Sequence, residues 1–321
     1  MLRTPWGVIV AGLATTLVLS ACGGQDDASS KKDDAPTVRI AHNSNAAILP
    51  ARIAQEQGYF KEAGLNVTFK LVENVGTLPP ALGKSFDIVQ VPPTSLIAAN
   101  AQGIKMVGIA GATVDIPSNP TSGVVTLKSS GITSLKQLKG KTLGVLTETG
   151  TLHTATRFAL DKVGVPLDSV KIVQVDGPAQ ADQLRSGRVD AVETLAPFRA
   201  TLLASGDTVD LGDPYLIMAP ELGAMMWGAQ GEWANKNPKL VEGFRTALTK
   251  AIAYTKANDK EARASLKAYT GLSDAIINKT VLPTYDAALR PQDLDIWLNA
   301  MKKVGGFNGK VELADLIPAT K

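Results

Sequence analysis

Short apolar runs alternate with helical stretches along most of the chain, and each run ends in polar or small residues. Val38 to Ala41 ends at a polar cluster, Phe86 to Val91 enters two prolines, and Thr142 to Leu146 leads toward Gly150. Apolar residues at helical spacing follow each run, as between Ala155 and Val163. Repeated strand, loop and helix units predict an α/β fold with mostly parallel sheets and helices on their faces.

The remaining patterns suggest two lobes and a helical C-terminal region. Further strands are expected at 67–71, 105–110, 123–127, 170–175, 189–194 and 224–230. The aperiodic segment 111–122 is expected to be a loop that crosses to the second lobe. Lobe 1 is therefore predicted to comprise residues 37–122 plus 228–321, and lobe 2 residues 123–227. Helices are expected at 238–252, 260–269, 273–281 and 291–303.

The N-terminus is typical of a targeting segment. Arg3 precedes an apolar run from Val8 to Leu19, which has the length of a signal-peptide core. The run closes with Leu-Ser-Ala-Cys, which resembles a bacterial lipobox and makes residues 1–21 a predicted signal peptide. Cys22, the only cysteine in the chain, would then carry a lipid, and residues 22–36 would form a flexible, lipidated tether. We therefore expect a protein that is lipid-anchored to the cell membrane on its extracytoplasmic side, in the periplasm or on the outer face.

Composition narrows the possible functions. Of 321 residues, 20% are charged and 45% hydrophobic, and the net charge of +3 includes no basic run, so nucleic acid is not an expected partner. The chain has no GxSxG, GxxxxGK[ST] or GxGxxG motif. Its two histidines, His42 and His153, are far apart in sequence and no cysteine pair exists, so we expect no metal, no cofactor and no catalytic residue.

Five segments carry a family resemblance. They are GYFKEAGLNV (58–67), DIVQVPPTSLIAANAQG (87–103), ITSLKQLKGKTLGV (132–145), GTLHTATRFAL (150–160) and QLRSGRVDAVETLAPF (183–198). In this order they resemble substrate-binding proteins of ABC transporters. The branch they resemble holds the nitrate, taurine and aliphatic-sulfonate receptors and the related thiamine-pyrimidine-type proteins.

The resemblance implies a two-lobed, hinged clamp of the type II periplasmic-binding-protein class. A ligand would lie between the lobes at the carboxyl ends of strands, and an ABC permease with its ATPase would receive it. The expected function is capture of a small polar organic ion, such as a sulfonate, taurine or nitrate, by a non-enzymatic, monomeric receptor. The alternatives are a thiamine-pyrimidine-precursor binding protein, a pyrimidine-synthase-type enzyme, or a sensor that signals to a kinase or channel.

Carried onto this sequence, the resemblance also implies a set of ligand-contacting residues. They follow the predicted strands and comprise His42, Asn43, Ser44, Gly76, Thr77, Pro93, Thr94, Ser95, Thr149, Gly150, Thr151, His153, Glu193, Thr194 and Leu195. Asn43, Ser44, Thr94 and Thr151 are equally consistent with helix capping alone. The histidines are expected in loops that meet across the cleft, one from each lobe.

Glu193 departs from the usual strand pattern, in which an apolar residue is commoner. The family often reads Trp-Glu-Pro where this chain has Leu195-Ala196-Pro197, so an aromatic wall and a carboxylate are missing there. Glu193 either pairs with Arg157 or Arg199, or it faces the cleft unpaired. In the second case it would repel an anion and favour a ligand with a donor or positive group, such as taurine or an aminopyrimidine.

Overall fold

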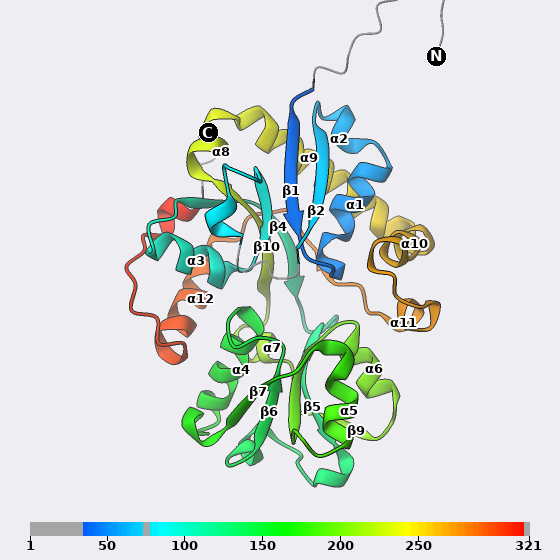
Figure 1. Cartoon of the computed structure of the whole chain (residues 1–321), viewed down its shortest axis with the longest axis vertical. Coiled ribbons are helices and arrows are strands. Elements are labelled where there is room, and N and C mark those ends of the chain that lie inside the picture. Colours follow the sequence, from blue (N-terminus) through cyan, green and yellow to red (C-terminus); the bar gives the residue numbers. More distant parts are fainter. Residues whose placement is uncertain (1–34, 73–77, 318–321) are drawn as a thin grey trace, which may run out of the picture. The chain divides into compact units, whose positions relative to one another are not determined.

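A computed structural model of the chain describes residues 35–72 and 78–317. Among the described residues, no helix is both long and apolar enough to cross a lipid bilayer. The predicted signal peptide, Cys22 and the ligand candidates Gly76 and Thr77 lie outside the described residues. Ala35 to Lys321 form one compact unit, which contains two sheets (Figure 1).

The first sheet has six strands, in the order β11-β4-β10-β3-β1-β2. Their bounds are β1 Thr37–His42, β2 Asn66–Leu71, β3 Ile88–Val91, β4 Met106–Asp115, β10 Leu222–Gln230 and β11 Thr284–Tyr285. β1 runs parallel to β2 and β3, whereas β10 is antiparallel to both of its neighbours. The carboxyl ends of β1 and β3 therefore lie at the same edge of the sheet.

The second sheet has five strands, in the order β7-β6-β8-β5-β9. Their bounds are β5 Ser122–Leu127, β6 Thr142–Val145, β7 Lys171–Gln174, β8 Ala191–Leu195 and β9 Thr208–Asp210. β6 is parallel to β7 and β8, and β5 is antiparallel to β8 and β9. The chain passes between the sheets twice, after β4 and before β10.

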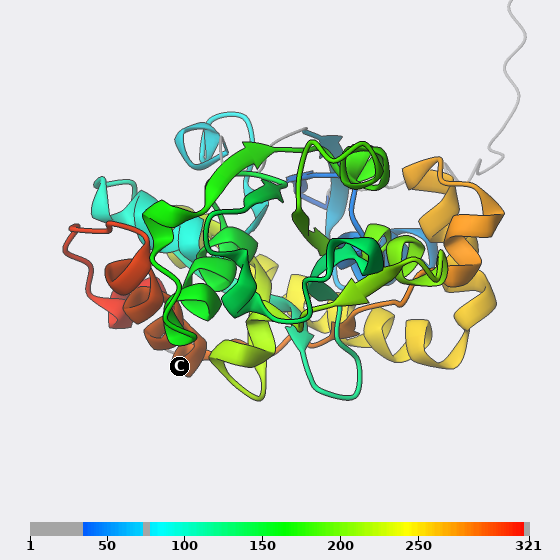
Figure 2. The same ribbon diagram turned by 90° about the horizontal axis from the view of Figure 1, so that it is seen from below.

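Helices pack on both faces of each sheet, and Figure 2 shows those of the second sheet from below. The α-helices are α1 Leu49–Glu56, α2 Tyr59–Glu62, α3 Pro93–Ala101, α4 Thr151–Lys162, α5 Gln180–Arg185, α6 Phe198–Ala204, α7 Pro214–Met218, α8 Gly231–Lys236, α9 Pro238–Ala257, α10 Asp259–Thr270, α11 Asp274–Lys279 and α12 Pro291–Val304. The helical C-terminal region expected from the sequence is present.

Aromatic side chains fill the core on both faces of the first sheet. On one face, Trp227 of β10 meets Phe244 of α9 edge-on at 5.4 Å, and Phe244 stacks on Phe60 at 5.7 Å. On the other face, Trp297 of α12 donates its ring N–H to the Gly223 carbonyl oxygen at 2.8 Å. Its ring also contacts Tyr215 of α7 edge-on at 5.8 Å. This second cluster joins a helix that follows the first sheet to one that follows the second.

Two local predictions are wrong, and one segment without a prediction contains a strand and a helix. β4 continues to Asp115, where a loop was expected, because Ala112 and Val114 are buried against neighbouring elements. The segment after α6, left unassigned, forms β9 and α7. Thr151 is the first residue of α4, and Gly150 takes the capping position with φ of 110°. The predicted lobe boundaries stay a prediction.

Gly111 lies where β4 comes very close to the backbone of the segment before α12. Its amide donates to the Ala287 carbonyl oxygen at 3.0 Å, and a Cβ at this position would collide with the backbone oxygens of Asp286 and Ala288. We expect Gly111→Ala to lower the free energy of unfolding by about 2 kcal/mol, since backbone on both sides must move.

Thermal unfolding followed by circular dichroism measures this effect. Gly231→Ala is the matched control, because a Cβ there would come no closer than 3.5 Å to its neighbours. Equal melting temperatures for the two variants would contradict the close approach at Gly111.

Candidate functional site

The predicted ligand residues that the structure describes lie at the carboxyl ends of parallel strands or at the starts of the helices that follow. His42 ends β1, and Pro93 begins α3 directly after β3. In the second sheet, Thr151 and His153 lie in the first turn of α4 after β6, and Glu193 lies near the end of β8. Because β1 neighbours β3 and β6 neighbours β8, each sheet brings its own candidates to one edge.

An apolar cluster connects the two edges. Leu152, between Thr151 and His153, belongs to the same cluster of buried residues as Val91 and Leu96, and Leu195 packs against that cluster. Farther along α4, the Lys303 ammonium of α12 lies 2.6 Å from the Asp161 carboxylate. The elements that carry the candidates of both sheets thus contact one another.

His42 is buried, and its ring is hydrogen-bonded to the backbone of the next residue. Its Nδ1 lies 2.8 Å from the Asn43 carbonyl oxygen, which can only accept, so Nδ1 carries the hydrogen. Burial lowers the pKa of His42, the bond to Asn43 opposes that shift, and the Arg52 guanidinium adds to it. His42 is therefore neutral at pH 7 and has Nε2 as a hydrogen-bond acceptor.

Glu193 is fully buried and pairs with His153. The His153 Nδ1 donates to Glu193 Oε2 at 3.2 Å, and both side chains are at most 4% exposed. Burial raises the pKa of Glu193, while the bond from His153 opposes the rise. The partner of Glu193 differs from both alternatives left open by the sequence, because Arg199 pairs with Asp210 and Glu193 is bonded to His153 instead of being unpaired. The two histidines also do not lie in loops, since His42 ends a strand and His153 lies within a helix.

Several buried oxygens at these strand ends have no hydrogen-bond partner among the described residues. Three belong to predicted site residues, namely Thr94 Oγ1, Glu193 Oε1 and Thr194 Oγ1. Two more belong to glutamines that the sequence analysis missed, namely Gln90 Oε1 in β3 and Gln180 Oε1 in α5. Since buried polar atoms in folded proteins are nearly always bonded, water or a solute is the expected partner.

The two glutamines are held in place by their amide nitrogens. Gln90 Nε2 donates to Asn45 Oδ1 at 3.2 Å, and Gln180 Nε2 donates to the Glu193 carbonyl oxygen at 2.8 Å. Both side chains are completely buried. A glutamine inside the apolar strand run IVQV was the available signal for Gln90, whereas nothing in the sequence marks Gln180.

The other predicted residues make fewer side-chain contacts. Thr151 Oγ1 lies 3.1 Å from the Tyr215 hydroxyl, and Thr149 Oγ1 lies 3.4 Å from Thr147 Oγ1. Asn43 Oδ1 accepts from the Asn45 side chain, and Ser44 is exposed. Thr151 therefore connects α4 to α7, while the exposed residues are open to solvent.

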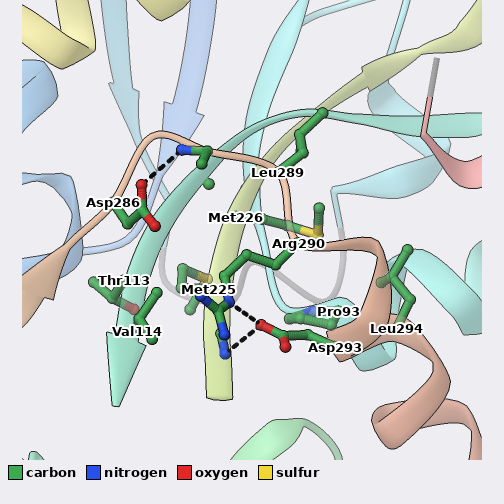
Figure 3. A pocket seen from close by; sticks show the side chains of 13 residues that line it. Pro93, Thr113, Val114, Met225, Met226, Asp286, Leu289, Arg290, Asp293 and Leu294 are labelled. Atoms are coloured by element: carbon green, nitrogen blue, oxygen red, sulfur yellow. Dashed lines mark hydrogen bonds and ion pairs between the residues drawn. The ribbon is translucent and has the colours of Figure 1, made fainter. Parts of the chain in front are cut away.

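A small pocket lies beside Pro93, between the first sheet and the start of α12 (Figure 3). It encloses about 20 Å³, enough for a water molecule but not for an organic solute. Asp293 Oδ2 accepts from the Gly223 amide and from Arg290 Nε, both at 2.7 Å, and Asp293 Oδ1 has no partner among the described residues. Methionines 225 and 226 line the pocket as well. The hydrogen bonds around this pocket join the start of β10 to the start of α12.

The residues that the structure describes contain no group of three or more histidine, cysteine, aspartate or glutamate side chains placed to hold a metal ion. Five of the free side-chain atoms near the strand ends are oxygens, and Arg52 Nε of α1 and Arg157 Nε of α4, which can only donate, also have no partner among the described residues. Three of the five can only accept hydrogen bonds, and the two hydroxyls can donate or accept. Such an arrangement suits the recognition of a ligand that carries N–H or O–H donors.

Two mixed sheets flanked by helices, joined by two crossings, define the periplasmic-binding-protein fold. The solved periplasmic aliphatic sulphonate binding protein SsuA of Escherichia coli superposes with a TM-score of 0.75 at 16% identity, over 89% of this chain and 92% of SsuA. At this identity the likeness concerns the fold.

The chain belongs to the NMT1/THI5-like family, whose model matches residues 45–262. A Haemophilus influenzae protein with the provisional name thiamine biosynthesis protein is 29% identical over 235 residues, which cover 70% of this chain and 69% of that protein. A 4-amino-5-hydroxymethyl-2-methylpyrimidine phosphate synthase of Saccharomyces cerevisiae is 25% identical over 231 residues, which cover 67% of this chain and 65% of the synthase. The chain thus spans about two thirds of these relatives.

The pair of His153 and Glu193 can be tested by a double-mutant cycle. His153→Ala leaves a carboxyl group buried without its partner, and we expect a loss of about 3 kcal/mol of unfolding free energy at pH 7. Glu193→Gln in the same chain removes the charge, so the double variant should be more stable than the sum of the single effects predicts.

Denaturant unfolding at pH 7 gives the free energy of unfolding of the parent protein, the two single variants and the double variant. Additive effects of the two substitutions would mean that the side chains do not interact.

Proposed function

We propose that this protein is the solute receptor of an ABC importer and that it binds a small polar organic molecule at the carboxyl ends of β1, β3, β6 and β8. The main support is the set of buried oxygens without partners at these ends. The fold of periplasmic binding proteins agrees with this role. The ligand residues named from the sequence form the proposed site, with Gln90 and Gln180 added to them.

The buried oxygens favour a ligand with hydrogen-bond donors. An inorganic anion or a simple alkanesulfonate offers only acceptors to Glu193, and placing it beside a buried carboxylate is unfavourable. An amino group matches Glu193 Oε1 and the glutamine oxygens. Taurine and aminopyrimidines both carry such a group, and we therefore place them ahead of nitrate and plain sulfonates.

The rival function is an enzyme of thiamine-pyrimidine synthesis. The yeast relative is named as a pyrimidine phosphate synthase, and the family model covers more than half of this chain. A receptor returns its ligand unchanged, whereas a synthase converts it. Mass spectrometry of the bound compound before and after prolonged incubation distinguishes these two functions.

The lipobox-like sequence also supports a proposal about where in the cell the protein is located. A lipid on Cys22 would hold the protein at the extracytoplasmic membrane face, close to a permease and its ATPase. The polar segment that follows would act as a tether. Closure of two lobes over the ligand would give the permease a distinct surface to bind.

A ligand screen tests the proposed class. We expect an amine-bearing compound to raise the melting temperature by several degrees, because a ligand at about 100 times its Kd adds about 2.7 kcal/mol. Nitrate and alkanesulfonates without an amine should have little effect. Differential scanning fluorimetry against taurine, alkanesulfonates, nitrate and aminopyrimidines measures the shift.

Glu193→Gln should remove most of the shift, since its amide no longer offers the second carboxylate oxygen. Glu232→Gln is the control, because Glu232 is exposed on α8 and pairs only with Lys236. A shift caused by nitrate that survives Glu193→Gln would overturn the ligand class.

The anchor is tested separately. Cys22→Ser should move the protein from the membrane fraction to the soluble fraction, because the thiol that would accept the lipid is gone. Fractionation of expressing cells followed by immunoblotting checks this. If the variant stays with the membrane as the parent protein does, lipidation at Cys22 is disproved.

A further inference from the structure

The two chain crossings between the sheets meet at a pair of buried acids. The first crossing runs from the end of β4 to the start of β5, and the second from β9 through α7 to β10, as Figure 1 shows in teal and yellow-green. Asp115 ends β4, and Asp213 caps the start of α7. Asp115 also pairs in register with Leu222, the first residue of β10, so it contacts both crossings.

Two neighbouring residues of the first crossing are bound by these acids. Asp115 Oδ1 accepts from the Thr121 hydroxyl at 2.6 Å and from the Thr121 amide at 3.2 Å. Asp213 accepts from the Ser122 hydroxyl, and its Oδ2 accepts from the Ser122 amide at 3.2 Å. Asp213 also accepts from the Tyr215 amide at 2.9 Å. The two carboxyl groups therefore hold the end of one crossing against the start of the other.

The charges around this pair are mostly negative or already paired. Asp115 is 2% exposed and Asp213 is 8% exposed, and each lies within electrostatic range of the other. Arg199 of α6 is the nearby cation, but it pairs with Asp210 and donates to the Pro120 carbonyl oxygen. Tyr215 of α7 lies within electrostatic range of both acids.

A second group of charges lies on the side of α12. Arg290 pairs there with Asp293 and Glu221, next to Gly223 of β10. Arg199, although paired with Asp210, lies within electrostatic range of Asp115, and its charge opposes the rise in the pKa of Asp115.

We propose that Asp115 and Asp213 form a proton-binding latch, in which a proton on Asp115 holds the two crossings together and its loss releases them. With the proton bound, Asp115 carries no charge beside Asp213, and both keep their bonds to Thr121 and Ser122. Burial raises the pKa of Asp213 as well, while its bonds from Ser122, Leu216 and Tyr215 oppose the rise and favour its charged form. Without the proton on Asp115, two buried carboxylates lie within electrostatic range of each other, and separation of the crossings relieves their repulsion. The latch adds a regulatory property to the protein and does not depend on the identity of its ligand.

The direction of the pH effect follows from the difference between the pKa of Asp115 in the closed state and its pKa in an opened state. Burial raises the pKa of Asp115 to about 7, the bonds from Thr121 oppose the rise, and Asp213 adds to it. In an opened state Asp115 returns toward its ordinary value near 4. The closed state is therefore favoured at acidic pH, and opening becomes up to about tenfold easier per pH unit as the pH rises from about 4 to 7. Above that range the effect of this group levels off.

Amide hydrogen exchange at Thr121 and Ser122 tests the latch in the full, ligand-free chain. Exchange is measured by NMR between pH 5 and 8 and corrected for the intrinsic rate. We expect the protection of these amides to fall by up to about tenfold per pH unit up to pH 7 and then to level off. In Asp115→Asn, which keeps an acceptor oxygen but cannot ionise, the protection should not change with pH.

Asp87→Asn is the matched control. Asp87 is also buried, but its bonds to Arg39 outweigh burial and lower its pKa, so this variant should keep the pH profile of the parent protein. If Asp115→Asn does not fold, Thr121→Val serves in its place. Loss of the threonine hydroxyl should raise the pKa of Asp115 further and move the levelling point to higher pH. A profile that is flat in the parent protein, or unchanged in Asp115→Asn or Thr121→Val, would overturn the latch.

Discussion

Two pairs of neighbouring parallel strands form the framework of the proposed ligand site. β1 lies beside β3 and β6 lies beside β8, so the loops and helix starts that follow them converge at one edge of each sheet. Backbone groups at such edges are no longer used by the sheet, and side chains there have room to face a ligand. The apolar cluster that includes Val91, Leu96 and Leu152 then brings the two edges into contact.

Removing polar groups from water is the energetically unfavourable part of this arrangement. Glu193, Asp115 and Asp213 are all removed from water, and each keeps its position through specific donors. His153 supports Glu193, while Thr121 and Ser122 support the two acids at the crossings. The Tyr215 hydroxyl, close to Thr151 of α4, connects the crossings to the helix that carries His153. Tyr215, whose amide donates to Asp213, thus links the proposed latch to Thr151 of the proposed site.

The sequence was sufficient to predict most of the fold and little of the side-chain chemistry. Strand runs such as Val38 to Ala41 and the C-terminal helices have clear periods, and they were placed correctly because burial on a strand or helix repeats regularly. The end of β4 was missed because Gly111, Thr113 and Asp115 interrupt its apolar pattern, although Thr113 and Asp115 are buried in the structure. The sequence left open whether Glu193 pairs with an arginine or faces the cleft, because it cannot reveal which neighbouring element supplies the partner of a buried side chain. Gln180 was missed for the same reason, since its role depends on a bond to the backbone of β8.

A crystal structure of the protein with the compound that stabilises it most tests the central claim directly. The account predicts density for that compound between the ends of β3 and β8, with an amino group bonded to Glu193 Oε1 and further bonds to Thr94 and Gln180. Density at any other place, or a compound that reaches none of these oxygens, would contradict it.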